Sequence, residues 1–174
     1  MNYATIKNYD IANGLGVRVS LFVSGCTHHC KGCFNDVAWD FMYGNEFTKE
    51  VEDQIIEMCR PNYIRGLSLL GGEPFEASNQ HALTELLRRF KKEYPNKDVW
   101  CYSGYLFDNI IDDNYRIHTD VTKEMLSYID VLVDGKFEID KKDISLKFKG
   151  SSNQRIIDVK KTLKENRIVN YFND

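Results

Sequence analysis

The chain has 174 residues, of which 43% are hydrophobic and 28% charged, and its net charge is −3. These values are typical of a soluble globular protein with one hydrophobic core, so we expect residues 1–174 to form a single domain. The even spread of charge argues against a nucleic-acid-binding or anionic-membrane-binding surface. The sequence shows neither a signal-peptide pattern nor an apolar run long enough to span a bilayer, and we expect a cytoplasmic protein.

Short apolar runs alternate with amphipathic segments along the chain. The runs predict buried strands, and apolar residues at helical spacing predict helices. In chain order the predicted elements are a strand over 16–25, a helix over 48–59 with Thr48 as its N-cap, a strand over 65–72, a helix over 78–94 with Ser78 as its N-cap, a strand over 98–105, a helix over 121–129, a strand over 130–135, a half-exposed edge strand over 145–150 and a closing helix over 154–167.

This alternation predicts an α/β fold built from βαβ units on a largely parallel sheet. A complete eight-fold barrel usually needs about 250 residues, so we expect a partial, open βα barrel or a curved sheet. Functional loops in such folds lie at the carboxyl ends of the strands. Several small or polar pairs follow predicted strands and are expected to converge, namely Gly71-Gly72, Ser103-Gly104 and Asp134-Gly135.

Three cysteines lie close together in GCTHHCKGCFN, residues 25–35, which we term the cysteine loop. Cys26, Cys30 and Cys33 have the spacing C-x3-C-x2-C, which in a cytosolic protein indicates metal binding or catalysis. Structural zinc sites and common iron–sulfur clusters use four protein ligands. Three thiolates instead suit a four-iron cluster whose fourth iron binds an external amine and carboxylate. A zinc site completed by His28 or His29 is the alternative, and the local sequence leaves both open.

The chain resembles the radical S-adenosylmethionine (SAM) enzymes in the cysteine motif and in the glycine-rich loop that begins at Gly71. Within that superfamily it is most similar to the activating enzymes of anaerobic (class III) ribonucleotide reductases. The matching segments are GVRVSLFVSGCTHHCKGCFN (16–35), LLGGEPF (69–75), WCYSGY (100–105), VLVDGKF (131–137) and FKGSSNQRIID (148–158). The sequence departs from similar activases at residues 13–16 and at Lys136, outside the cluster and SAM motifs.

The resemblance implies a [4Fe-4S] cluster on Cys26, Cys30 and Cys33, with SAM as ligand of the remaining iron. Reductive cleavage of SAM would then yield a 5′-deoxyadenosyl radical, with no catalytic residue required beyond the cluster and the SAM site. The implied SAM-site residues are Gly32, Cys33, Phe34, Asn35, Gly71, Gly72, Glu73, Ser103 and Asp134.

The roles implied for these residues differ. The turn of Gly32, Cys33 and Phe34 would offer backbone groups to the adenine, and Asn35 would contact the ribose. Each also has a local alternative: Gly32 can simply allow the turn, and Asn35 can stabilise it.

At the other strand ends, Gly71 and Gly72 would direct backbone carbonyls to the SAM ammonium group, with Glu73 supporting the loop. Asp134 would face the SAM pocket or cap a helix, and Ser103 is a weaker candidate of the same kind. The polar turn of residues 151–155 would help to bind SAM or a partner.

The implied partner is the glycyl-radical subunit of the anaerobic ribonucleoside-triphosphate reductase, in which one glycine would lose a hydrogen atom. A flavodoxin or ferredoxin would supply the electron. Other targets remain open, either another glycyl-radical enzyme such as pyruvate formate-lyase or a small nucleoside-like substrate, as does a zinc or redox module without enzymatic activity. No histidine is required as a base, and His28 and His29 are expected at the loop surface.

Overall fold

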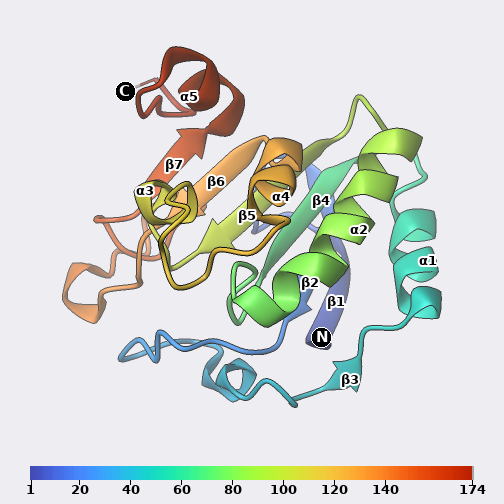
Figure 1. The fold of residues 1–174 in the computed structure, drawn as a ribbon, viewed down its shortest axis with the longest axis horizontal. Helices are drawn as coiled ribbons and strands as arrows, with labels where there is room; N and C mark the ends of the chain where they lie inside the picture. Colours follow the sequence, from blue (N-terminus) through green and yellow to red (C-terminus); the bar gives the residue numbers. More distant parts are fainter. Residues whose placement is uncertain (174) are drawn as a thin grey trace.

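The centre of the molecule is a seven-stranded sheet with the order β3-β1-β2-β4-β5-β6-β7. We describe residues 1–173 in a computed structural model (Figure 1). The strands are β1 (Asn2–Asp10), β2 (Val17–Val23), β3 (Asn45–Glu46), β4 (Ile64–Gly71), β5 (Asp98–Ser103), β6 (Val131–Asp134) and β7 (Arg155–Asp158). The helices are α1 (Lys49–Met58), α2 (Ala77–Glu93), α3 (Phe107–Ile110), α4 (Thr122–Tyr128) and α5 (Val159–Glu165), with 3-10 turns η1 (Asp36–Trp39) and η2 (Ile139–Lys141).

Four strands form the parallel middle of this sheet. The pairs β2–β4, β4–β5 and β5–β6 are parallel, whereas β1 and β7 pair antiparallel at the two sides. Because β3 and β7 stand at opposite ends of the strand order, the sheet is open. The expected α/β class with a parallel central sheet is confirmed, and the carboxyl ends of β2, β4, β5 and β6 lie along one edge.

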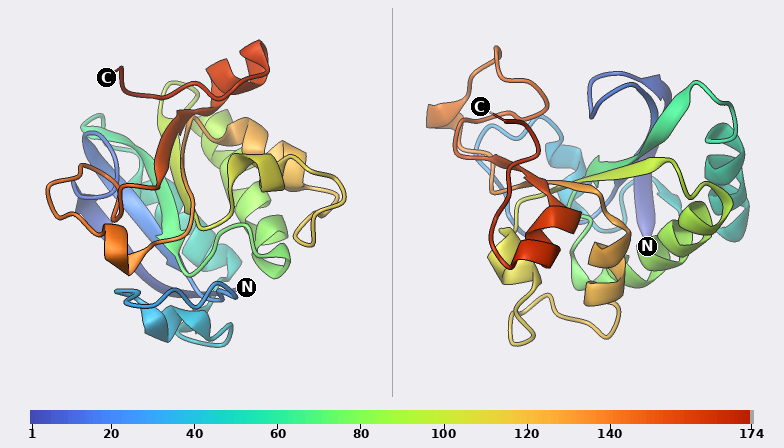
Figure 2. Two further views of the ribbon diagram at one scale, coloured as in Figure 1. Left: turned by 90° about the vertical axis from the view of Figure 1, so that its left-hand side faces the viewer. Right: turned by 90° about the horizontal axis from the view of Figure 1, so that it is seen from above.

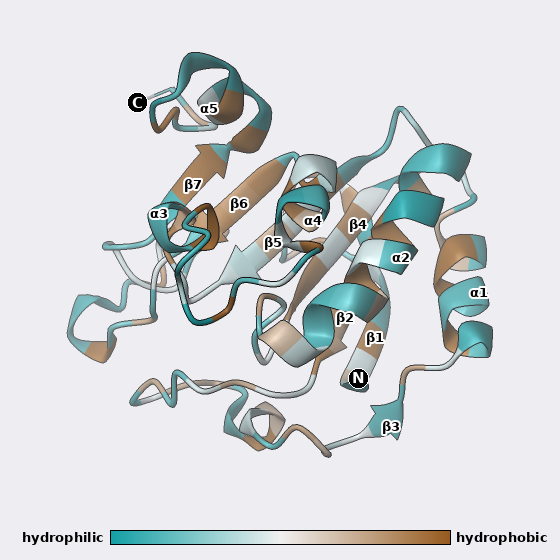
Figure 3. Ribbon diagram, in the orientation of Figure 1, coloured by the Kyte–Doolittle hydropathy of each residue, from teal (hydrophilic) through white to brown (hydrophobic). Residues whose placement is uncertain are grey.

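Alternate residues of the central strands face two different environments. On β2, Val19, Leu21 and Val23 belong to the hydrophobic core together with residues of α1, α2 and α4. Figure 3 shows this apolar character along the strands and the hydrophilic outer surface of α2. The intervening Arg18 and Ser20 are also buried, so the opposite face of the sheet combines polar side chains with a second apolar cluster of Trp100, Val131 and Val133. The burial of each large apolar side chain contributes about 1.5–3 kcal/mol.

The N-termini of α1 and α2 test two predicted N-caps. Thr48 caps α1 as predicted, because its side chain accepts a hydrogen bond from the Val51 N–H. The prediction that Ser78 caps α2 is wrong: the helix already begins at Ala77, after Glu76, and Ser78 is exposed in its first turn. None of the helices within residues 1–173 combines the length and the apolar character that a bilayer crossing requires.

The C-terminal predictions need correction. Residues 145–150 form an irregular segment instead of an edge strand, and Phe148 there has a φ of 62°, which interrupts an extended backbone. The predicted helix over 154–167 divides into β7 and the shorter α5. Residues 155–158 pair with β6, and Asp158 then caps α5 by accepting from the Lys161 N–H at 3.0 Å. Sheet pairing therefore overrides the helical periodicity at the start of this segment.

The first strand has no counterpart among the predicted elements. β1 is mostly half-exposed or exposed and lacks an apolar run, so only its pairing with β2 defines it. The short elements β3, α3, η1 and η2 were likewise not predicted, because two to four residues carry too little periodicity.

A buried arginine, Arg18, connects three strands on this second face of the sheet. Arg18 has no exposed surface, lies 2.6 Å from Asp98 Oδ1 and donates to Ser68 Oγ at 2.7 Å. Its guanidinium also lies over the ring of Trp100. Burial lowers the pKa of Arg18, and the nearby Asp98 charge opposes this effect. The ion pair therefore keeps a charged side chain inside the fold and connects β2, β4 and β5.

We predict that Arg18→Met lowers the free energy of unfolding by about 1–3 kcal/mol, since the buried Ser68 hydroxyl and Leu67 carbonyl lose their charged donor, whereas Asp98 is partly exposed and keeps Arg65 as a partner. Urea unfolding of anaerobically prepared protein, followed by circular dichroism, measures this change. Arg60→Met is the matched control, because Arg60 and its partner Glu57 are both exposed and such pairs contribute about 0–1 kcal/mol. Equal stability of the two variants would contradict the structural role of Arg18.

Candidate active site

A cavity of about 530 Å³ lies at the carboxyl ends of the parallel strands. Its size is within the range of about 300–1,000 Å³ that is typical of small-molecule sites. The cysteine loop and the ends of β4, β5 and β6 form one side of it. The other side is the β6–β7 segment, residues 135–154. Lining residues from the first side include Cys26, His28, Cys30, Gly32, Cys33, Phe34, Gly71, Gly72, Ser103 and Gly104.

All three clustered cysteines line this cavity as free thiols. Cys26 comes shortly after β2 and is 8% exposed, whereas Cys30 and Cys33 are half-buried. The Cys33 N–H donates to the Cys30 carbonyl at 3.1 Å, which closes a tight turn. A Cβ atom on Gly32 would lie 2.8 Å from Ile139 Cδ1, so the turn packs closely against the β6–β7 segment (Figure 2).

The thiols are in an environment that suits a bound cationic centre. Burial raises the pKa of the Cys26 thiol to about 12, although the N–H groups of His28 and His29 oppose this. Burial also raises the pKa of Cys30, and the Phe137 N–H opposes it. A thiolate at Cys26 therefore needs a neighbouring positive charge, which iron would supply. Within residues 1–173, no three His, Cys, Asp or Glu side chains converge on one metal ion. The thiolates of a four-iron cluster bind different irons and need no such convergence.

The glycine pair lets β4 end directly against the cysteine loop. Gly71 has a φ of 111°, and a Cβ atom there would lie 2.6 Å from the Val23 backbone. A Cβ atom on Gly72 would lie 2.5 Å from the Gly25 carbonyl oxygen. Only glycine fits both positions. The Gly72 N–H donates to Val23, while no donor within residues 1–173 occupies the Gly72 carbonyl, which is available to a ligand.

Glu73 is the most connected side chain of the site and has no exposed surface. Its Oε1 atom accepts from His28 Nε2 at 2.9 Å, Ser103 Oγ at 2.9 Å and the Gly104 N–H at 2.7 Å. Its Oε2 atom accepts from the Phe75 N–H at 2.8 Å. The carboxylate thus joins the cysteine loop, its own loop and the end of β5. The prediction that His28 lies at the loop surface is wrong, since its side chain is 4% exposed.

A second buried carboxylate holds the other side of the cysteine loop. Glu76 is 5% exposed and accepts from both the N–H and the hydroxyl of Thr27, at 2.8 and 2.7 Å. Arg116 donates to the same Thr27 hydroxyl and to Tyr105. Glu76 was not among the predicted site residues. Its only local signal is its position three residues after Glu73, and that signal does not indicate a contact with the cysteine loop. The fold alone brings it to Thr27.

The polar turn of residues 151–155 fastens the β6–β7 segment. The Asn153 side chain donates to the Lys136 carbonyl at 2.8 Å, and the Gln154 side chain donates to the Gly135 carbonyl at 2.9 Å. The Ser151 hydroxyl accepts from the Glu138 N–H at 3.2 Å. These contacts shape the wall of the cavity, and of this turn Gln154 lines the cavity itself.

Two candidate residues lie behind the cavity surface. Asp134 is fully buried, and its carboxylate accepts from Arg155 Nε at 2.9 Å and from the Phe107 N–H at 2.7 Å, the first residue of α3. These contacts hold the carboxylate against α3 and Arg155, although Asp134 itself lies in β6 and the N-cap residue of α3 is Leu106. Hydrogen bonding to Asp134 raises the pKa of Arg155. Asn35 precedes η1, and its carbonyl accepts from the Ala38 N–H at 3.0 Å. Neither residue is among those that line the cavity.

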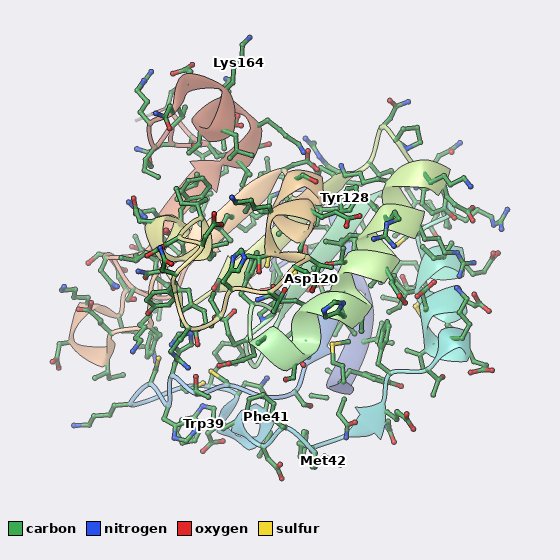
Figure 4. All side chains as sticks on the ribbon, viewed as in Figure 1. Trp39, Phe41, Met42, Asp120, Tyr128 and Lys164 are labelled. Carbon is green, nitrogen blue, oxygen red and sulfur yellow. The ribbon has the colours of Figure 1, made fainter. Side chains whose placement is uncertain are left out.

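Several exposed apolar residues follow the three cysteines in the sequence. Phe34 lines the cavity yet is 85% exposed, and Met42 is 76% exposed. Figure 4 shows Phe41 and Met42 beside Trp39 at the lower margin of the molecule. Phe41 is the closest side chain to Gly25, where a Cβ atom would overlap its ring. Exposed apolar side chains thus lie at the end of the cysteine loop, at Phe34, and in the segment after it, at Phe41 and Met42.

Comparison with known proteins agrees with this geometry. The 4Fe-4S single cluster domain family matches residues 12–157. The chain is 43% identical over 158 residues to the anaerobic ribonucleoside-triphosphate reductase-activating protein of Vibrio cholerae, covering 90% of this chain and 97% of that protein. Proteins of the same name from Escherichia coli K12 and Enterobacteria phage T4 are 42% and 38% identical, over 88% and 90% of this chain and 96% and 93% of theirs.

The cluster family favours iron and sulfur over zinc on the three cysteines, and the extent of the similarity confirms the resemblance seen in the motifs. The chain therefore belongs to the family of anaerobic ribonucleoside-triphosphate reductase-activating proteins and contains a 4Fe-4S single cluster domain.

Proposed function

We propose that this protein activates an anaerobic ribonucleoside-triphosphate reductase by generating a glycyl radical on it, with SAM as cosubstrate. The observation that carries the proposal is the position of all three cysteines on one wall of a cavity that the Gly71-Gly72 strand end also lines. When bound, the reduced cluster and SAM supply the chemistry, a 5′-deoxyadenosyl radical that removes a hydrogen atom from a glycine of the reductase.

The fold supports a partial βα barrel of the radical SAM type. Four parallel strands present their carboxyl ends to the cavity, as functional barrels do, while the open strand order leaves the barrel incomplete. An open side suits a partner whose reacting atom lies in a protein loop. We include residues 1–174 in this one domain.

The chain's own residues bind and orient the two cofactors in this proposal. Cys26, Cys30 and Cys33 hold the cluster, and the Gly72 carbonyl accepts from the SAM ammonium group. The turn of Gly32 and Phe34 forms the adenine side of the cavity. Asp134 accepts hydrogen bonds from Arg155 and from the first residue of α3 and thereby holds both in place. We assign it no direct contact with SAM.

One strongly exposed apolar side chain lies on each side of the cavity. Phe34 on the cysteine loop is 85% exposed, and Ile144 on the β6–β7 segment is 94% exposed, and both line the cavity. Contact with the glycyl-radical subunit would cover these side chains and exclude water from the radical. A flavodoxin or ferredoxin remains the proposed electron donor.

We predict that Cys→Ser substitution at position 26, 30 or 33 abolishes both cluster assembly and radical formation, since each thiolate binds a separate iron. Iron and sulfide content, together with the glycyl-radical doublet in electron paramagnetic resonance spectra of mixtures with SAM, a reductant and the reductase, measure the two losses. Cys59→Ala is the control, because Cys59 is buried in the core away from the cavity. A doublet that persists in any of the three serine variants would refute the assignment. Cleavage of SAM without a doublet in the wild-type protein would point to another substrate.

A second prediction concerns Glu73 as a positioning residue. Glu73→Gln replaces one acceptor oxygen by an NH2 group that faces other donors, so at least one buried donor loses its partner. We expect a loss of about 1–3 kcal/mol in the free energy of unfolding and a lower iron content after reconstitution. Thermal unfolding and iron analysis provide the measurements. Glu85→Gln on the exposed face of α2 is the control. A Glu73→Gln variant with normal stability and full iron content would exclude this role.

A further inference from the structure

A second cavity, of about 450 Å³, lies between the β6–β7 segment, β7 and the end of the chain. Its lining comes from residues between positions 146 and 156 and from Asn170 and Phe172 near the C-terminus. Its volume is within the range that is typical of small-molecule sites. Neither the three cysteines nor the Gly71-Gly72 pair lines it, so it is distinct from the site of the function proposed above.

The chain around this cavity carries positive charge only. Residues 144–157 include Lys147, Lys149 and Arg155 and no Asp or Glu, whereas the whole chain has a net charge of −3. All three cationic side chains line the cavity, and no carboxylate within residues 1–173 does so. A cavity with several cationic groups and no lining acid attracts an anion that carries more than one charge.

These side chains keep hydrogen-bond donors for a ligand. Arg155 uses Nε and Nη2 for two carboxylates, which compensate its charge, but no acceptor in the described part of the chain contacts its Nη1 atom. The Lys149 amine donates one of its three hydrogens to the Gln154 carbonyl at 3.0 Å. Lys147 is exposed, and its amine has no partner among residues 1–173. The two lysines therefore supply the uncompensated charge, and such donors suit phosphate oxygens.

Uncharged groups complete the lining. Ser152 and Asn170 are exposed there and offer donors and acceptors of the kind that bind sugar hydroxyls and base edges. Phe172 is 37% exposed and also lines the cavity, and nucleobases stack on aromatic rings of this kind. The Tyr171 N–H donates to the Ile156 carbonyl at 2.8 Å, so the end of the chain is fastened to β7 beside the cationic groups.

We propose that this second cavity binds a nucleoside triphosphate. The phosphate groups lie at the three cationic side chains, where their charge compensates the two lysines. The base lies against Phe172 and covers its exposed ring. Inorganic phosphate alone would leave this ring uncovered, so the combination of cationic and aromatic groups favours a nucleotide. The site goes beyond the function proposed above and does not depend on it.

Lys147→Gln tests the phosphate end of the site, because Lys147 lines only the second cavity. Lys142→Gln is the matched control, since it removes the same charge from the same segment but lines only the candidate active site. Equilibrium dialysis of anaerobically reconstituted protein, freed of excess iron, against labelled ATP or CTP measures the affinity. We expect both nucleotides to bind, Lys147→Gln to weaken both affinities about 5-fold, as for one exposed charge pair, and Lys142→Gln to keep them.

Phe172→Leu tests the base end of the site. Leucine keeps an apolar side chain at this position but removes the flat ring on which a base stacks. We expect ATP to bind about 10-fold more weakly to this variant, whereas tripolyphosphate, which has no base, binds it as it binds the wild-type protein. Urea unfolding followed by circular dichroism checks that each variant retains the fold.

Three results would overturn the proposal. The first is that neither nucleotide binds the wild-type protein at millimolar concentration. The second is a loss of affinity in Lys142→Gln and not in Lys147→Gln, which would place the nucleotide in the candidate active site. The third is an affinity for ATP that Phe172→Leu leaves unchanged, since the base would then lie elsewhere. The assay contains neither SAM nor the reductase, so a failure of the function proposed above would not alter these results.

Discussion

The buried carboxylate of Glu73 is the constraint on which the arrangement of the site depends. A charge without solvent is tolerated only when hydrogen bonds surround it, and here the donors come from the cysteine loop, from its own loop and from the end of β5. If one of these segments moved away, the charge would lose a donor without gaining water. Each such bond to a charged group contributes about 1.5–3 kcal/mol. The electrostatic requirement of one side chain therefore fixes the relative positions of three segments that are distant in sequence.

The segment after β4 holds the cysteine loop at two neighbouring points. Glu73 binds His28, and Glu76 binds Thr27, so the residues directly after Cys26 are anchored on both sides. The glycine pair makes this possible because a side chain at Gly72 would collide with the Gly25 carbonyl. The loop that offers a free carbonyl to a ligand thus also positions the first cysteine. In the proposed function, one short stretch of chain thereby places the cluster site and the cosubstrate site relative to each other.

Local patterns made the central strands, the cysteine motif and the glycine pair predictable, since each depends on neighbouring residues. The contacts that complete the site were not predictable, because they join residues far apart in sequence. His28 was predicted to lie at the loop surface, but the fold places Glu73 against it, and no local pattern indicated that Arg155 pairs with Asp134. The same limit explains β7, where helical periodicity was outweighed by pairing with β6. Long-range pairing, which single-sequence patterns do not encode, decided all three cases.

The two walls of the cavity differ in construction, and this difference is consistent with the proposed partner. One wall consists of strand ends and the anchored cysteine loop, where buried carboxylates and sheet pairing fix the backbone. The other wall is an irregular segment fastened mainly by the polar turn of residues 151–155. Cofactors need the first kind of wall, because reactive groups must be held in defined geometry. A protein loop needs an entrance that a closed barrel would not provide, and the open sheet with apolar side chains at its mouth offers one. Fixed strand ends for the proposed cofactors and an open side for the proposed partner therefore follow from the same open sheet.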